Sequence, residues 1–297
     1  MASLARSERR GPGAHGAVGA PTATDRQADL RTLLRTLNLT HAASVFGDVA
    51  LQATKAGLTH EAFLYELVRG ECEHRAQRRV ERDLRRSGLP REKTFRSLQL
   101  ARFGAPLQLQ IERLRTGTFV EEAVNCIAVG RPGVGKSHLA AALGHELIVQ
   151  GHTVLWTTTA TLVQRLLAAK RDLHLPQALA KLDRFACLIL DDIGYVQHDR
   201  DEMEVLFTLL AERYERRSVI LTTNLVFSDW NRIFKDPMTT LAAIDRVVHH
   251  SVILDLLAVD SYRALEAGAH NAPHHRQPAT PPSPAPSAPM RPTEVTP

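Results

Sequence analysis

The sequence predicts an α/β protein in which a parallel β-sheet is flanked by helices and preceded by a smaller helical region. Three observations indicate this class. Short runs of β-branched and apolar residues recur between residues 122 and 263, and runs with helical spacing lie between them. Such strand–helix alternation is typical of a parallel sheet. Residues 27–115 contain helical runs alone, and a glycine-rich motif directly follows the first strand run.

Composition divides the chain of 297 residues into four expected segments. Residues 1–26 are rich in Gly, Ala and Arg without periodicity, so we expect a disordered leader. Residues 27–115 form the helical region, and residues 116–266 form the α/β domain. Residues 267–297 contain nine prolines, which predicts a disordered tail. With 44% hydrophobic and 23% charged residues, the chain as a whole has the composition of an ordinary globular protein.

The strand and helix candidates can be placed in order. The expected strands are VNCIAVG, TVLWTT, ACLIL, SVILTT and SVILDL, at residues 124–130, 153–158, 186–190, 218–223 and 251–256. The expected helices include LRTLLRTLNL at 30–39, the long run at 60–88, LQLQIERLR at 107–115, the run at 136–151 and the run at 202–217.

Several classes of protein are excluded. The longest stretch without a charged residue, residues 147–164, holds five threonines, so we expect no membrane association. The N-terminus lacks the apolar core of a secretory signal. Cys72, Cys126 and Cys187 are odd in number and far apart, which predicts free thiols, a reducing compartment and no zinc site; Cys126 and Cys187 lie in apolar runs and are expected to be buried.

A phosphate-binding loop is predicted between the strand at 124–130 and the helix at 136–151. Residues 130–137 fit G-x-x-x-x-G-K-[ST], and the loop lies in the strand–loop–helix context that the motif requires. Backbone N–H groups and the helix N-terminus would bind phosphate oxygens, Lys136 would reach the β- and γ-phosphates of ATP, and Ser137 would ligate Mg²⁺. The residues expected to hold the nucleotide are Gly130, Arg131, Pro132, Gly133, Val134, Gly135, Lys136, Ser137 and His138. A glycine-rich turn without a ligand is the alternative.

Acidic and polar residues follow two further strands. Asp191 and Asp192 end the apolar run CLIL, and we expect Asp191 to help hold Mg²⁺ while Asp192 orients or deprotonates the attacking water. Asn224 ends SVILTT, where it could hydrogen-bond the γ-phosphate or the water. The two aspartates could instead cap the next turn, and Asn224 could instead cap the segment that follows its strand. Arg246 and Arg263 are candidates for neutralising phosphate charge, and each could instead form a surface ion pair with a nearby aspartate.

A stripe of arginines is predicted on the long helix at 60–88. Between Arg69 and Arg102 lie eleven Arg and Lys against five Asp and Glu, so this segment accounts for the whole net charge of +5. At about 100° per residue, six arginines share one face about 120° wide. They are Arg75, Arg78, Arg79, Arg82, Arg85 and Arg86. Such a face suits the backbone of duplex DNA, and a solvated helix face is the alternative.

These residues together resemble the IstB-type transposition helper ATPases, a family of the AAA+ superfamily related to the DnaC-type helicase loaders. The resemblance covers about residues 30–263. It rests on GRPGVGKSHLAAALG, VLWTTTATLVQRLL, LILDDIGYV, EVLFTLLAERYERRSVILTTNL, DWNRIFKDP, AAIDRVVHHSVILDL and DSYR, with EKTFRSL upstream as a linker into the ATPase domain.

The resemblance implies more than the spacing shows. It implies an AAA+ fold with a Walker A motif at 130–137, a Walker B motif at Asp191 and Asp192, and a sensor 1 residue at Asn224. It assigns Arg246 as an arginine finger that reaches a neighbouring subunit's ATP, and Arg263 as the sensor 2 arginine. It also implies binding to duplex DNA, ATP-dependent homo-oligomers, a transposase encoded alongside, and a location in the bacterial cytoplasm, on the nucleoid when DNA is bound.

One departure from the wider superfamily is visible, because many AAA+ proteins end Walker B in Asp-Glu where this chain has Asp191-Asp192. The shorter side chain predicts slow turnover. A helicase loader is the main alternative, and the arginine stripe favours the transposition helper. A structural DNA-binding protein with an inactive nucleotide site is disfavoured by the intact Lys136, Ser137 and Asp191. A small-molecule kinase is a poor fit because no substrate lid is visible.

Overall fold

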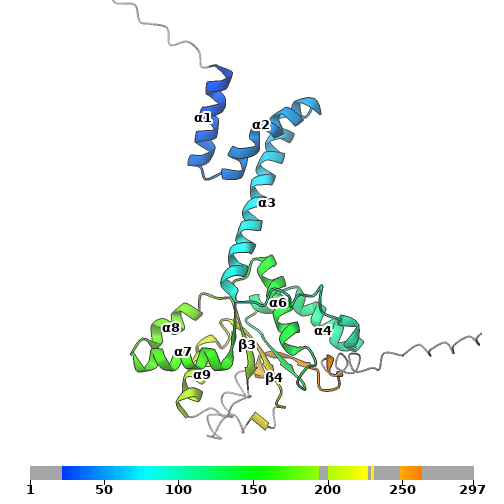
Figure 1. Cartoon of the computed structure of the whole chain (residues 1–297), viewed down its shortest axis with the longest axis vertical. Coiled ribbons are helices and arrows are strands. Elements are labelled where there is room, and N and C mark those ends of the chain that lie inside the picture. The colour runs from blue at the N-terminus through cyan, green and yellow to red at the C-terminus, as the bar shows by residue number, and fades with distance from the viewer. Residues whose placement is uncertain (1–21, 194–199, 227–228, 231–247, 263–297) are drawn as a thin grey trace, which may run out of the picture. The chain divides into compact units, whose positions relative to one another are not determined.

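The computed structural model describes residues 22–193, 200–226, 229–230 and 248–262 (Figure 1). Much of the predicted leader and all of the predicted tail lie outside these residues, as do Arg246 and Arg263. Contacts divide the chain into two units. One comprises the residues up to Gly88 with Ile148–Thr153, and the other comprises Leu89–Leu147 and the residues from Val154 onward.

The second unit is built on a five-stranded, fully parallel sheet with the order β2-β3-β4-β1-β5. Its strands are β1 Asn125–Val129, β2 Val154–Thr158, β3 Cys187–Ile193, β4 Ser218–Thr223 and β5 Ser251–Asp255. All five predicted strands are therefore confirmed, and so is the predicted class of a parallel sheet flanked by helices. Every residue of β1 and β4 is buried, as expected for parallel strands that are covered on both faces.

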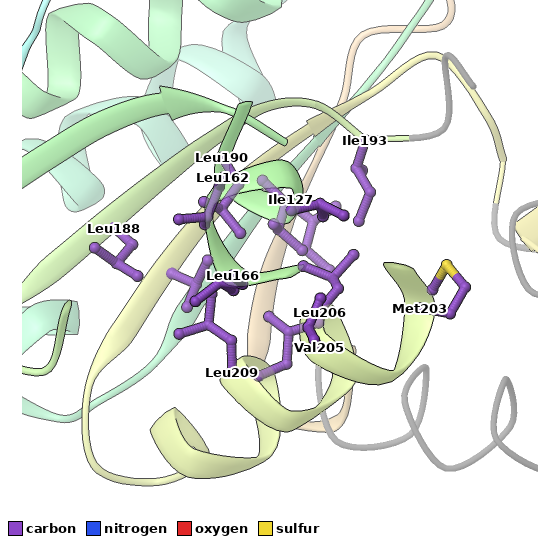
Figure 2. Close-up of a cluster of buried hydrophobic side chains, with 14 of the residues drawn as sticks. Ile127, Leu162, Leu166, Leu188, Leu190, Ile193, Met203, Val205, Leu206 and Leu209 are labelled. Carbon is purple, nitrogen blue, oxygen red and sulfur yellow. The ribbon is translucent and has the colours of Figure 1, made fainter. Parts of the chain in front are cut away.

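Two amphipathic helices cover one face of the sheet with their apolar sides. Leu188 and Leu190 of β3 pack with α7 (Thr159–Arg171) and α9 (Arg200–Arg213), and Figure 2 shows Leu162 and Leu166 of α7 and Leu206 of α9 within this cluster. Side chains alternate along a strand, so the intervening Ile189 points to the opposite face.

Helix α6 (Lys136–Gln150) lies on that opposite face (Figure 1). At Gly144 an added Cβ would come within 2.7 Å of the Ile189 Cδ1 atom, so the glycine lets this helix approach the sheet closely. The other helices in the described part of this unit are η1 Leu100–Arg102, α4 Ala105–Arg115, α5 Thr118–Glu121 and α8 Leu175–Leu182.

The described residues of the first unit form helices α1 Ala23–Thr36, α2 Thr40–Lys55 and α3 His60–Ser87, and the unit also includes the last residues of α6. Helix α1 begins within the predicted leader because Thr22 and Asp25 form a capping box. Helix α3 ends at Gly88, whose φ of 71° suits a glycine at the end of a helix. A small core forms around Ala42, Phe46 and Leu67.

The boundary between the two units falls at Gly88 and Leu89. Residues 89–115 group with the sheet because Leu107, Ile111 and Leu114 of α4 are buried, and α4 contacts β5. All three cysteines lie in the described part of the chain and are free thiols, with Cys126 and Cys187 fully buried as predicted. Among the described residues, we find no helix with the length and apolar character needed to span a membrane.

Candidate functional site

The glycine-rich loop connects β1 to α6 and adopts a conformation that requires glycine. Gly133 and Gly135 have φ values of 84° and 106°, in the region that side chains with a Cβ rarely adopt. The loop begins at the sheet, where the Gly130 amide donates to the Thr223 carbonyl at 3.1 Å. The loop therefore starts at the carboxyl edge of the parallel strands, where α/β proteins bind ligands.

Lys136 opens α6 and is 6% exposed. Its Nζ atom donates to the carbonyl oxygens of Gly130 at 2.8 Å and Arg131 at 3.0 Å. The ammonium group is thus held over the loop that precedes its own helix. This places a positive charge and the positive end of the helix dipole beside the same loop.

A cleft of about 510 Å³ opens at the loop. It brings together most of the predicted site, because residues from the loop, from the end of β3 and from the end of β4 line it. The predicted residues that line it are Pro132, Gly133, Val134, Gly135, Lys136, Ser137, His138, Asp192 and Asn224.

Three of the described residues that were predicted for the nucleotide site do not line the cleft. Gly130 is buried behind it, where an added Cβ would come within 2.9 Å of the Leu256 Cβ atom, so its place in the motif reflects close packing. Arg131 is exposed. The third is Asp191 of β3, which is buried with 8% of its surface exposed.

The two aspartates at the end of β3 point in different directions. The Asp191 Oδ1 atom accepts a hydrogen bond of 2.6 Å from the Thr222 hydroxyl, and the Asp191 carbonyl accepts one of 3.1 Å from the Thr159 hydroxyl. Asp192 is exposed and has a φ of 60°. An anchored inner carboxylate and an outer carboxylate that faces a cleft suit two different chemical tasks.

The oxygen atoms available as metal ligands suit Mg²⁺ better than a transition metal. Magnesium prefers hard oxygen ligands and is commonly held by one or two carboxylates together with phosphate oxygens. The Ser137 hydroxyl and the Asp191 carboxylate supply such oxygens. Among the described residues we find no group of three or more His, Cys, Asp and Glu side chains that could hold a metal by themselves.

A segment upstream of the loop also lines the cleft, a position that its sequence does not predict. Its members are Lys93, Ser97, Leu98, Gln99, Arg102 and Phe103. The His138 Nε2 atom lies 3.1 Å from both the Thr94 carbonyl and the Ser97 hydroxyl, so α6 holds this segment against the loop. The sequence EKTFRSL is predicted to be a linker, and nothing in its pattern indicates a place beside the phosphate loop.

The segment after β5 reaches the same cleft. The Tyr262 amide donates to the Gly133 carbonyl at 3.0 Å, and Tyr262 lines the cleft. The Arg102 guanidinium lies 5.2 Å from the centre of the Tyr262 ring and donates to the Asp260 carbonyl. Two segments far apart in the sequence therefore meet at the loop. Arg263 follows Tyr262 directly, but it lies outside the described residues, as does Arg246.

All six predicted arginines lie on α3 and are exposed. Three of them have contacts within the chain. Arg75 donates to Glu71 at 2.8 Å and to the Asn38 carbonyl at 2.6 Å, Arg82 pairs with Asp83, and an added Cβ at Gly151 would come within 3.2 Å of the Arg79 guanidinium. Within the part of the chain that the structure describes, no ion pair holds Arg78, Arg85 or Arg86.

Comparison with known proteins identifies relatives over most of the chain. The family described as IstB-like ATP binding protein matches residues 32–268. A protein of Sinorhizobium fredii (strain NBRC 101917 / NGR234), named as an insertion-sequence ATP-binding protein, is 43% identical over 82% of this chain and 83% of its own length. A protein of Pseudomonas aeruginosa, named as an ATP-binding protein of the insertion sequence IS21, is 37% identical over 80% of this chain and 89% of its own length.

Among solved structures, the DnaC helicase loader is similar, with 23% identity and a TM-score of 0.43 over 50% of this chain and 88% of that one.

Proposed function

Because the chain belongs to the family of IstB-like ATP-binding proteins, we propose that it binds and hydrolyses ATP with Mg²⁺ and acts as the helper of an insertion-sequence transposase. One observation carries the ATP part of the proposal. The loop from Gly133 to Ser137 lines one cleft together with Asp192 and Asn224, which come from two other strands. A loop that binds phosphate, a carboxylate and an amide thus face the same space.

Each of these residues has a task in phosphoryl transfer. The backbone amides of the loop bind phosphate oxygens, and Lys136 exchanges its two carbonyl partners for the β- and γ-phosphates. Ser137 and Asp191 would hold Mg²⁺, which supplies charge neutralisation when bound. Asp192 orients the water that attacks the γ-phosphorus and accepts its proton, while the bond to the ADP oxygen breaks. Asn224 orients the same water or the γ-phosphate.

Arg246 and Arg263 complete the proposed site, Arg246 as a finger for the ATP of a neighbouring subunit and Arg263 as a sensor in its own subunit. Hydrolysis should then depend on protein concentration, since it needs an ATP-dependent homo-oligomer. Arg246→Ala should bind ATP but hydrolyse it on the order of a thousandfold more slowly. Mixing Arg246→Ala with Lys136→Ala should restore part of the activity, because some interfaces then combine an intact loop with an intact finger.

Duplex DNA is the proposed second ligand, and the exposed arginines of α3 support it. Phosphate contacts need exposed cations and no particular base sequence. Arg78, Arg85 and Arg86 meet this description most directly. The transposase partner rests on the relatives, which are named for insertion sequences. This naming disfavours a helicase loader as the alternative.

ATP turnover with and without duplex DNA tests the proposal as a whole. We expect slow turnover that depends on Mg²⁺ and changes when duplex DNA is added. A matched Asp192→Asn variant should retain nucleotide binding and lose turnover, because it keeps the shape of the side chain and removes the proton acceptor. Equal turnover in both proteins would contradict the role of Asp192. A wild-type protein that fails to bind ATP would contradict the proposal itself.

A further inference from the structure

Thr222 connects the two aspartates of the site through one hydroxyl group. Its Oγ1 atom lies 2.6 Å from Asp191 Oδ1 and 2.9 Å from the Asp192 backbone nitrogen. Thr222 itself is fully buried in β4, at 0% exposure. A buried hydroxyl is costly unless it is hydrogen-bonded, so these two bonds account for the polar group at this buried position of β4.

The direction of both bonds follows from the chemistry of the groups. A backbone N–H can only donate, so the Thr222 oxygen accepts from Asp192. The single hydroxyl proton of Thr222 is then donated to Asp191 Oδ1. A hydrogen bond at Oδ1 restricts rotation of the carboxylate about its χ2 bond. It therefore also fixes the direction of the second oxygen, Oδ2.

The strand pairing explains why a side chain is needed here. Leu190 pairs with Leu221 and Ile193 pairs with Thr223, so β3 advances three residues while β4 advances two. The extra residue forms a bulge, in which two residues of one strand oppose one of the other. Here Asp191 and Asp192 of β3 lie opposite the single residue Thr222 of β4. The Thr222 side chain supplies the hydrogen-bond acceptor for the Asp192 amide at this irregularity.

The bulge also separates the directions of the two carboxylates. Asp191 is 8% exposed, whereas Asp192 is exposed, lines the cleft and has a φ of 60°. A positive φ at a residue other than glycine is costly and persists only where its surroundings hold it. The bond between the Asp192 amide and Thr222 is one of the contacts that hold this conformation.

We propose that Thr222 is a positioning residue of the metal–nucleotide site, whose hydroxyl orients the Asp191 carboxylate and holds the backbone of Asp192 at the same time. The inference rests on the proposed function, because it assigns Asp191 to Mg²⁺. Thr222 acts through Asp191 and Asp192 and does not itself line the cleft. Partners that orient a metal-binding carboxylate typically change metal affinity or activity by about ten- to a hundredfold when they are removed.

Three variants of the full chain separate this role from a general role in packing. Thr222→Val keeps the size and β-branching of the side chain and removes the hydroxyl, and Thr222→Ser keeps the hydroxyl. Ser218→Ala is the matched control, since Ser218 is another fully buried hydroxyl of β4 whose partner is the Phe119 carbonyl at 3.1 Å. If Thr222→Val fails to fold, Thr222→Ala removes the same hydroxyl without adding a methyl group.

The measurement is the affinity of Mn²⁺ for the protein bound to a non-hydrolysable ATP analogue, followed by electron paramagnetic resonance. We expect Thr222→Val to bind Mn²⁺ about tenfold or more weakly than wild type, and Thr222→Ser and Ser218→Ala to match wild type. When EDTA removes the metal, affinity for the analogue should be equal in all four proteins, because the contacts of the phosphate-binding loop remain.

Equal Mn²⁺ affinity in wild type and Thr222→Val would overturn the inference while leaving the proposed function intact. A loss of Mn²⁺ affinity in Ser218→Ala as large as in Thr222→Val would also overturn it, because the effect would then come from strand packing. If the wild-type protein binds neither the analogue nor Mn²⁺ in its presence, the proposed function itself fails, which is a distinguishable result.

Discussion

The Nζ atom of Lys136 lies 2.8 Å from the carbonyl oxygen of Gly130, within the loop that the same lysine closes. The lysine is buried, and the Gly130 and Arg131 carbonyls accept hydrogen bonds from its ammonium group, so the cation is held over the loop. Hydrogen bonds to charged groups contribute about 1.5 to 3 kcal/mol. We expect nucleotide affinity to depend on the proposed exchange of these carbonyls for phosphate oxygens.

Lys136→Ala should therefore weaken ATP binding by about tenfold or more, since no other described side chain is held over the loop in this way. Lys181→Ala is the control, because Lys181 is an exposed lysine of α8 that does not line the cleft. Binding of a fluorescent ATP analogue measures both. Equal affinity of Lys136→Ala and wild type would exclude this loop as the nucleotide site.

The arginines of α3 should contribute to DNA affinity without reading sequence. Changing Arg78, Arg85 and Arg86 together to Gln should weaken binding on every duplex and reduce the salt slope by about 2 to 3 units, since each phosphate contact contributes about 0.9. A salt titration of binding to fluorescent duplex DNA measures the slope.

The control for charge alone is the triple change of Arg113, Arg165 and Arg171 to Gln, which removes three exposed arginines outside α3. It should leave the slope unchanged. If the α3 variant also keeps the wild-type slope, its arginine face does not contact DNA phosphates. ATP binding should survive in both variants because neither triple lines the cleft.

Gly144→Ala should destabilise the α/β unit by about 1 to 3 kcal/mol. The new Cβ would meet Ile189 Cδ1 at 2.7 Å and Leu89 Cδ2 at 2.9 Å, so the core must shift. Gly47→Ala is the matched control in helix α2. The nearest atom to a Cβ there is 4.0 Å away, so it should instead stabilise by about 0.5 to 1 kcal/mol. Urea unfolding of both variants checks this, and equal effects would refute the packing argument.

Stability should fall at alkaline pH because of two buried thiols. Burial raises the pKa of the Cys187 thiol from 9.0 to about 12 and raises that of Cys126 well above its ordinary range. In the unfolded chain both thiols ionise near 9, whereas in the folded protein they stay protonated. The folded state then binds more protons, so the free energy of unfolding decreases as the pH rises above 9.

Between pH 8 and pH 10 the expected loss is about 1.4 kcal/mol for each thiol. Urea unfolding at pH 8, 9 and 10 measures it, with the double variant Cys126→Ala and Cys187→Ala expected to show a flatter dependence. The range ends at pH 10 because burial lowers the pKa of Arg213 to about 10. Above that pH the folded protein loses a proton that the unfolded chain keeps, so the contribution of Arg213 raises the free energy of unfolding. An unchanged pH dependence in the double variant would contradict the assignment to these thiols.

The strands and the phosphate loop were predictable from sequence for a local reason. Strands buried on both faces appear as continuous apolar runs, as in CLIL before Asp191 and SVIL before Thr222. The glycines at 133 and 135 are needed by the loop's own backbone angles, whatever lies around them. The shared face of the α3 arginines could also be predicted locally, because helical periodicity alone places them on one side of the helix.

The rest of the site depends on neighbours that are distant in sequence. Residues between Lys93 and Phe103 line the cleft because His138, more than forty residues later, bonds to Thr94 and Ser97. The hydrophobic periodicity of a sequence does not predict a contact between residues so far apart. The place of Tyr262 beside Gly133 is likewise decided by the pairing of β5 with β1, which brings the end of the described chain back to the loop.

By itself, the sequence determined the alternation of strands and helices, the phosphate loop with Lys136, and the acidic end of β3. These depend on periodicity and on backbone geometry within a few residues. The tertiary structure alone decided that Asp191 is buried and Asp192 exposed, and that Thr222 bonds to both. The reason is that a bulge arises from the pairing of two strands, and the sequence of one strand does not specify its register against the other.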